Sequence, residues 1–159
     1  MNTAHFHLMV NHLPLVGVLI GLFVLAFGVF FKKEDIIRTA TGIFIFSSLM
    51  SAAAFLSGEE AEEVVEDMQG VSETMIHIHE ESAELFLIMT TILGIGAILV
   101  LILSFTQARY KTICNYCLLI LSVITLVISF NTGNSGGQIR HSEIRSENQV
   151  IHLNDDDDN

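Results

Sequence analysis

Four long stretches of apolar residues without a single charge run through this 159-residue chain. They cover approximately residues 13–31, 40–56, 85–105 and 113–130. A helix rises about 1.5 Å per residue, so about 20 residues cross the ~30 Å hydrocarbon core of a bilayer. Each stretch must be helical in lipid, because its backbone groups have no water to bond there. The sequence therefore predicts an all-α integral membrane protein with four transmembrane helices.

The connecting segments predict how these helices are arranged. Connections of about seven residues follow the first and third stretches, so each of those helix pairs is expected to be antiparallel. After Gly58, apolar residues recur with helical spacing among many glutamates, at Ala61, Val64, Val65 and Met68. Gly70 is typical of a helix end and Ser72 of an N-cap. We expect an up-down four-helix bundle whose second and third helices extend outside the membrane as an acidic helical hairpin.

Charge is distributed unequally between the two ends of the predicted bundle. The loops after the first and third stretches hold five of the seven basic residues: Lys32, Lys33, Arg38, Arg109 and Lys111. The opposite side holds sixteen of the eighteen carboxylates. Short loops rich in Lys and Arg stay in the cytoplasm. Both termini are therefore expected on the outer, periplasmic side of a bacterial inner membrane, and nothing favours nucleic-acid binding.

Residues 1–147 are expected to form this one transmembrane domain. The segment 131–137, Asn-Thr-Gly-Asn-Ser-Gly-Gly, is rich in turn-forming residues and predicts a turn that folds back over the bundle mouth. Residues 148–159 contain four consecutive aspartates and predict a solvated, flexible acidic tail.

Histidines fall only on the acidic side of the predicted bundle. All seven do so: His5, His7, His12, His77, His79, His141 and His152. His77 and His79 point about 200° apart on a helix, so one of them at most faces the interior. His79 is the better candidate because it shares a helix face with Ala83 and Phe86.

Four of these histidines are expected to converge at one bundle mouth. They precede or open the first helix, open the third, or follow the fourth: His7, His12, His79 and His141. Imidazoles gathered from several helices commonly hold haem iron or a transition metal. The plainer alternative is that each is an interfacial imidazole that bonds carbonyl groups or lipid headgroups.

Four short motifs occur in a fixed order along most of residues 5–145. They are Leu-Met-Val-Asn-His-Leu-Pro at 8–14, Ser-Gly-Glu-Glu-Ala-Glu-Glu at 57–63, His-Glu-Glu-Ser-Ala at 79–83 and Gly-Gly-Gln-Ile-Arg-His at 136–141. Their order resembles an uncharacterised family of bacterial four-helix inner-membrane proteins with cytochrome-like histidines. Some relatives in that family look like membrane cytochromes joined to c-type modules. The resemblance implies His12, His79 and His141 as core positions of a haem or metal site, with His7 as a fourth.

The leading hypothesis is a membrane cytochrome-like protein that takes part in electron transfer. Two facing imidazoles, such as His12 and His79, are expected to ligate a b-type haem near the outer face, and Arg140 to pair with a propionate. The expected partners are the lipid bilayer and redox proteins of the membrane or periplasm. Covalent attachment of the c-type is not expected, because the sequence has no Cys-x-x-Cys-His.

Two other hypotheses stay open. The same site, made of His7, His12, His79 and His141, would suit a Zn, Cu or Fe ion. Alternatively, the chain is a non-catalytic accessory subunit of a larger membrane complex, and its acidic hairpin docks a partner. No nucleophile–base pair stands out, so independent catalytic activity is not predicted.

Cys114 and Cys117 form a Cys-x-x-Cys at the start of the fourth helix. A redox or metal-binding pair is one interpretation. The favoured one is two small apolar residues in a reducing compartment, because no second pair accompanies them.

Overall fold

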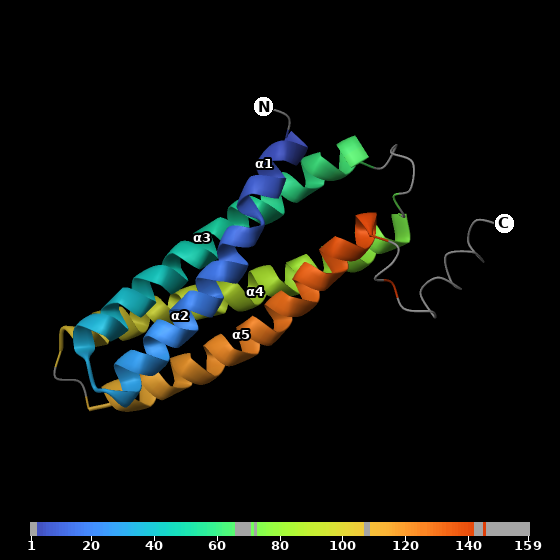
Figure 1. Ribbon diagram of the computed structural model, residues 1–159. Helices are drawn as coiled ribbons and strands as arrows, with labels where there is room; N and C mark the ends of the chain where they lie inside the picture. The colour runs from blue at the N-terminus through green and yellow to red at the C-terminus, as the bar shows by residue number, and fades with distance from the viewer. Residues whose placement is uncertain (1–2, 66–70, 72, 107–108, 142–144, 146–159) are drawn as a thin grey trace.

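The computed structural model describes residues 3–65, 71, 73–106, 109–141 and 145. The elements in these residues are all helices: α1 (Thr3–Val10), α2 (His12–Phe30), α3 (Glu34–Val65), α4 (Glu73–Ser104) and α5 (Lys111–Arg140) (Figure 1). Four helical lengths are long and apolar enough to cross a membrane: Ala4–Phe30, Glu34–Val64, Glu73–Ser104 and Lys111–Ile139. The all-α class and the four helices of spanning length, predicted from the sequence, are thereby confirmed.

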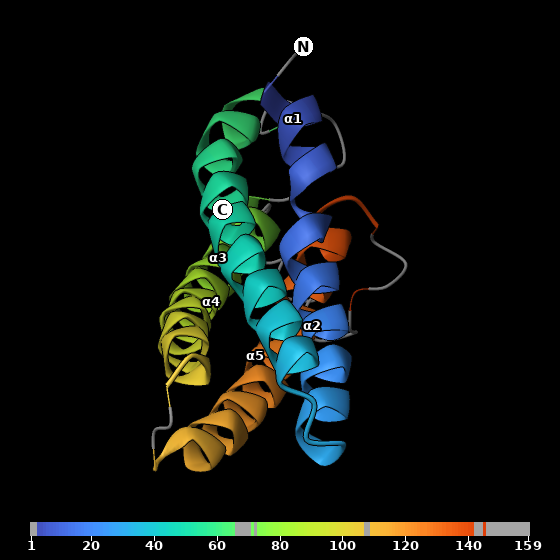
Figure 2. The same cartoon turned by 90° about the vertical axis from the view of Figure 1, so that its left-hand side faces the viewer.

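The long helices pack in chain order. Helix α2 packs on α3, α3 on α4 and α4 on α5, and α5 returns to α2 (Figure 2). The turn between α2 and α3 is a Schellman motif, in which the Lys33 N–H bonds the Gly28 carbonyl at 2.8 Å and the Lys32 N–H bonds the Val29 carbonyl at 3.3 Å. Lys32 takes the left-handed conformation that this motif needs, with φ 54°. The chain therefore reverses within three residues, which makes α2 and α3 antiparallel.

Helices α3 and α4 are longer than a bilayer requires. Each has 32 residues and is therefore about 48 Å long, against a hydrocarbon core of ~30 Å. Their acidic ends continue past the charge-free segments 40–56 and 85–105 as helix, in keeping with the expected extension. Met68, Gly70 and Ser72, which predict the tip of this hairpin, lie outside the described residues, as do residues 148–159.

The first predicted helix has one interruption in its hydrogen-bond pattern, at Asn11, where the backbone keeps helical angles (φ −61°, ψ −28°). The Asn11 N–H bonds the His7 carbonyl at 2.9 Å, so α1 ends with a regular helical bond. Pro14 has no N–H to give to the Val10 carbonyl, and its ring crowds that carbonyl. This places Pro14 in the first turn of α2, where proline is tolerated. Helix α1 therefore forms a separate short segment that packs mainly on α3 (Figure 1).

The bundle exposes many large apolar side chains, and its core mixes apolar residues such as Phe44 and Leu93 with small hydroxyl residues. Large apolar side chains cover the outside, among them Phe30 at 69% and Leu56 at 68% exposure. Many small hydroxyl side chains are buried between the helices: Thr41, Ser47, Ser51, Thr90, Ser122, Thr125 and Ser129. Most of these satisfy their hydroxyl by donating to a carbonyl one turn earlier in the same helix, as Thr90 does to Phe86 at 2.9 Å. Small polar residues inside and apolar ones outside are what helix packing in lipid favours.

The predicted turn at 131–137 is wrong, because α5 continues as helix through Arg140. Packing against α4 outweighs the local turn preference. The Thr132 hydroxyl donates to the Ser82 carbonyl of α4 at 2.9 Å, and Gly136 lets the two helices approach closely around the His79 ring. His141 therefore follows the end of the helix directly, with its N–H bonded to the Gly137 carbonyl at 3.1 Å.

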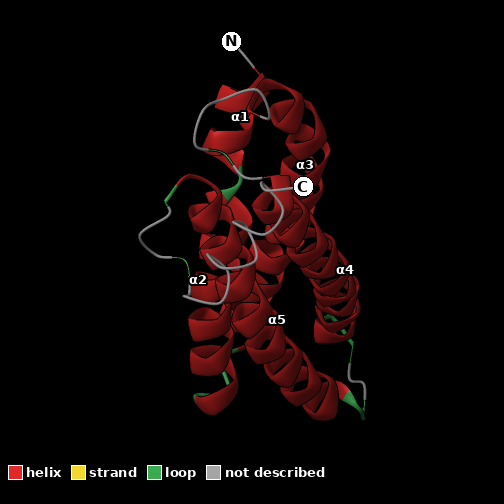
Figure 3. Ribbon diagram, turned by 90° about the vertical axis from the view of Figure 1, so that its right-hand side faces the viewer, coloured by secondary structure: helices red, strands yellow, loops and turns green. Residues whose placement is uncertain are grey.

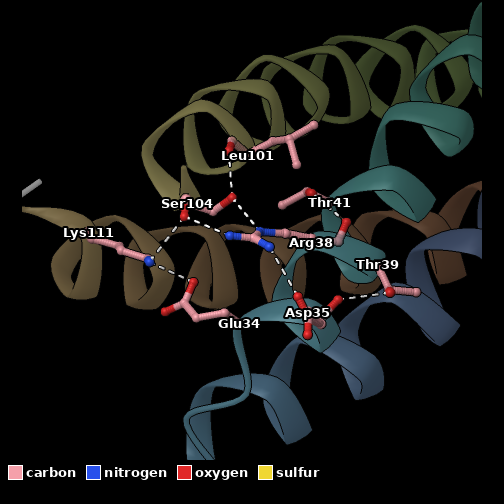
Figure 4. Close-up of polar contacts among 8 residues, drawn as sticks. All are labelled: Glu34, Asp35, Arg38, Thr39, Thr41, Leu101, Ser104 and Lys111. Atoms are coloured by element: carbon pink, nitrogen blue, oxygen red, sulfur yellow. Dashed lines mark hydrogen bonds and ion pairs between the residues drawn. The ribbon is translucent and has the colours of Figure 1, made fainter. Parts of the chain in front are cut away.

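A polar network ties three helices together at the end of the bundle that carries Lys32, Lys33, Arg38, Arg109 and Lys111, here called the basic end (Figure 4). Arg38 of α3 donates to the Ser104 hydroxyl and to the Ser104 carbonyl of α4, both at 3.0 Å. Its guanidinium also bonds Asp35 at 3.1 Å and lies 4.4 Å from the Phe105 ring centroid. Lys111 of α5 pairs with Glu34 of α3 at 2.7 Å. These contacts join α3, α4 and α5 at the basic end.

Candidate functional site

A cavity of about 770 Å³ lies at the opposite end, here called the histidine end. Figures 1 and 3 show α1 beside the far part of α3 on one side, and α4 beside the end of α5 on the other. The cavity lies between these two helix pairs, and its lining includes all four predicted site histidines: His7, His12, His79 and His141. Much of the remaining wall is apolar, with Leu15, Phe55, Ile76 and Phe86 among the lining residues. The volume falls within the range of roughly 300–1,000 Å³ typical of cofactor sites.

His7 is presented by α1 and held by α3. Its Nδ1 lies 3.0 Å from the Ala54 carbonyl oxygen and 3.2 Å from the Ser57 hydroxyl oxygen. The ring packs beside Gly58. A Cβ built on Gly58 would stand 3.6 Å from the His7 Cε1. His7 thus reaches the cavity from α1, which lies against α3.

His79 is presented by α4 and held by α5. Its Nδ1 lies 3.1 Å from the Ser135 hydroxyl oxygen. The ring fits against Gly136 so closely that an added Cβ would stand 3.0 Å from Cε1. The prediction that His79 rather than His77 faces inward is confirmed, since the His77 side chain is 75% exposed and lies 3.6 Å from Glu80.

Burial keeps both rings neutral near physiological pH. His7 and His79 precede the charge-free segments 13–31 and 85–105, so they stand at the ends of the apolar zone rather than within it. Burial lowers the pKa of His7, and the neighbouring charge of His12 adds to this, while a backbone hydrogen bond to Ala54 opposes it. Burial likewise lowers the pKa of His79, with His7 adding and a backbone hydrogen bond to Thr132 opposing. A neutral imidazole is the form that binds a metal.

The remaining predicted site residues lie at the rim. His12 and His141 are exposed, although both line the cavity. The side chain of Arg140 lies outside the described part of the structure. Within the described ranges, no three His, Cys, Asp or Glu side chains are close enough together to hold a metal ion. The four histidines therefore share one cavity, but only His7 and His79 are built into its walls.

Sequence reasoning missed the residues that support the two rings. Ser57 and Gly58 stand beside His7, and Ser135 and Gly136 stand beside His79. The sequence carries one signal for these residues, because the dipeptide Ser-Gly occurs both at 57–58 and at 135–136. Asn11 was missed as well. Its Oδ1 is buried, lines the cavity region and has no hydrogen-bond partner among the described residues.

The cysteine pair stands far from this site. Cys114 is half-buried and Cys117 exposed, and neither is in a disulfide. Both line a separate cavity of about 140 Å³ between α4 and α5. Nothing in this arrangement links them to the histidine end.

The fold and site define a class of protein: a helical bundle of membrane-spanning length with an imidazole-walled cavity at one end. Comparison with protein-family models, with curated proteins and with solved structures gives no match. The resemblance to an uncharacterised bacterial membrane family stays a prediction from the sequence motifs.

Proposed function

We propose that this chain is a bacterial inner-membrane haem protein that transfers electrons, with a b-type haem held between His7 and His79. The observation that carries the proposal is a pair of half-buried imidazoles that line one cavity from different helices, each with its Nδ1 hydrogen-bonded to a neighbouring helix. A metal-bound histidine typically donates its other ring N–H to a carbonyl, carboxylate or water, and that partner orients the ring. His7 has such a partner in the Ala54 carbonyl, and His79 has the Ser135 hydroxyl in the corresponding place.

The exposed surface supports the membrane part of the proposal. The apolar side chains on the outside of α2–α5 would be costly in water and are at home in lipid. The basic end would face the cytoplasm and the histidine end the periplasm, because Lys and Arg in short loops stay inside. The cavity would then open at the outer surface, where periplasmic or membrane redox proteins reach it.

The cavity suits a haem in size, lining and ligand number. Haem supplies four of its own nitrogens to the iron, so the protein needs to add only one or two ligands. His7 and His79 are two, and the apolar residues Leu15, Phe55 and Phe86 would contact the faces and edges of the ring and exclude water. His12 and His141, which line the cavity and are exposed, would meet the propionates, and Arg140 is proposed for the same role from its place beside His141 in the sequence. When bound, the iron would supply the one-electron chemistry. His7 and His79 would be its protein ligands.

The first test measures haem binding by matched histidine variants. The purified apoprotein in detergent is titrated with haemin, and binding is followed by the Soret band. His7→Ala and His79→Ala are each expected to weaken binding by at least tenfold and to lose the six-coordinate spectrum. His77→Ala removes an exposed imidazole two residues from His79 and should bind like wild type. Equal binding by all four proteins would contradict the assignment of the axial pair.

A bare transition-metal ion is the second candidate. Glu59, Glu62 and Glu80 line the same cavity as the histidines, and mixed N and O donors suit Zn, Cu or Fe. Such an ion needs a third protein ligand, which movement of His12, His141 or one of these glutamates would have to supply. Elemental analysis of protein that carries no Soret band, with metal retained by wild type and lost in the His7→Ala and His79→Ala variants, would favour this candidate over haem.

A further inference from the structure

Ser57 of α3 and Ser135 of α5 occupy equivalent positions beside the two half-buried imidazoles. Ser57 donates its hydroxyl hydrogen to the Ala54 carbonyl at 2.9 Å, three residues earlier. Ser135 donates in the same way to the Thr132 carbonyl at 3.0 Å. A hydroxyl has one hydrogen, so each serine oxygen is left as an acceptor toward its imidazole.

The contacts of Nδ1 decide where each imidazole carries its proton. His7 Nδ1 faces two acceptors, the Ser57 oxygen and the Ala54 carbonyl. His79 Nδ1 faces the Ser135 oxygen at 3.1 Å. Because the Ala54 carbonyl oxygen only accepts, Nδ1 must be the N–H in the neutral ring of His7, and its Nε2 carries the lone pair. For His79, the hydroxyl hydrogen of Ser135 is given to the Thr132 carbonyl, so the Ser135 oxygen favours the same tautomer.

A glycine follows the serine at both sites and gives the ring its space. The ring of His79 is the more tightly held, with 3.0 Å between its Cε1 and a Cβ built on Gly136. For His7 and Gly58 the corresponding distance is 3.6 Å, an ordinary contact. In each Ser-Gly dipeptide, the serine thus provides a hydrogen-bond acceptor and the glycine leaves room for the imidazole ring. The two dipeptides lie on two helices that line one cavity.

We infer that Ser57 and Ser135 are a matched pair of positioning residues, which fix His7 and His79 as Nδ1–H tautomers and make both Nε2 atoms ligands of equal kind. The inference deepens the proposed function and rests on it for the identity of the ligand. It adds that His7 and His79 would both coordinate a bound haem iron, which would leave no open position for oxygen or another small molecule.

The tautomers are measured on the apoprotein, so that this test does not depend on haem. Protein labelled with 15N-histidine in detergent micelles at pH 8 gives long-range 15N–1H correlations, which distinguish the two tautomers. We expect two rings with a protonated Nδ1 and a bare Nε2, whose signals disappear in His7→Ala and His79→Ala. The Ser135→Ala variant should turn His79 into a mixture of tautomers and leave His7 unchanged, and Ser135→Thr, which restores the hydroxyl, should restore the single tautomer.

The matched control is Ser129→Ala. Ser129 lies on the same helix, is buried, and donates to the Leu126 carbonyl at 2.8 Å without meeting an imidazole. It should change neither ring. In haemin titrations, Ser57→Ala and Ser135→Ala are each expected to weaken binding by about 10–100-fold, the usual effect of removing the partner of a ligating histidine.

The outcomes separate this inference from the proposed function. An Nε2–H tautomer in either ring of the wild type, or a Ser135→Ala variant that behaves like Ser129→Ala in both measurements, would overturn the inference. Two Nδ1–H rings in a protein that binds no haemin would uphold it and reject haem as the ligand. If the protein binds haemin but its iron has a five-coordinate spectrum, the inference that both histidines coordinate the iron would be rejected. The proposal that the protein binds haem would stand.

Discussion

Burial separates two imidazoles from the other histidines that the structure describes. His5, His12, His77 and His141 are exposed, whereas His7 and His79 are half-buried and hydrogen-bonded through Nδ1 to neighbouring helices. A ring in that setting loses hydration when it is protonated and has little freedom to rotate. The proposed haem binding at the histidine end would therefore depend on these two residues.

The lowered pKa of His79 predicts how acid affects the apoprotein. The folded pKa lies below the ordinary value of 6.5, so the unfolded chain binds the proton more readily than the folded one. The contribution to stability is full above pH 6.5 and is lost as the pH falls from 6.5 through the folded pKa. Thermal unfolding in detergent should therefore show a lower midpoint at pH 5.5 than at pH 8, and His79→Asn should reduce that difference.

His77→Asn is the control for this measurement, because the His77 side chain is 75% exposed. Its midpoint should depend on pH as the wild type's does. An equal pH dependence for wild type and His79→Asn would show that protonation of His79 does not oppose folding.

At the scale of the helices, close packing of α2 on α3 sets the geometry of the bundle. Gly28 of α2 lies so close to α3 that an added Cβ would stand 3.0 Å from the Ile37 backbone nitrogen and 2.8 Å from its Cγ1. Backbone atoms cannot move aside as a flexible side chain can. The two helices can therefore approach this closely only if residue 28 has no side chain.

Gly28→Ala is expected to destabilise the bundle by about 1–3 kcal/mol, the usual cost of overpacking. Gly42→Ala on α3 is the matched control, because no atom lies within 4 Å of its added Cβ. That variant should be neutral or gain up to about 1 kcal/mol from the better helix propensity of alanine. Reversible unfolding of the detergent-solubilised protein would measure both, and equal stabilities would contradict the close contact at Gly28.

Local sequence patterns predicted the helices well and the site only in part. Runs of apolar residues and the spacing of Ala61 and Val64 are local signals, and so is the helix face that His79 shares with Phe86. The helix through 131–137 was not predictable in this way, because contacts with α4 outweigh the turn preference of its glycines. The choice of His7 over His12 as the partner of His79 depends on the interruption at Asn11 and on how α1 packs against α3, which no local pattern records.

For the whole molecule, the two ends of the bundle have different roles. The basic end is closed by the Arg38–Ser104 and Lys111–Glu34 contacts. The histidine end holds the cavity and most of the carboxylates. Between them the surface is apolar and the interior is rich in small hydroxyl groups. This architecture suits a membrane protein that keeps a cofactor near one surface, within reach of an electron-transfer partner.

The central claim is that this cavity holds haem iron through two imidazoles. The most direct measurement is the optical spectrum of the protein purified in detergent from membranes, first oxidised, then reduced with dithionite, then exposed to carbon monoxide. The account predicts a Soret band, sharp α and β bands on reduction, about one haem per chain, and a reduced spectrum that carbon monoxide leaves unchanged, because both axial positions are filled. The absence of a Soret band, in protein from haem-replete cells and after reconstitution with haemin, would contradict it.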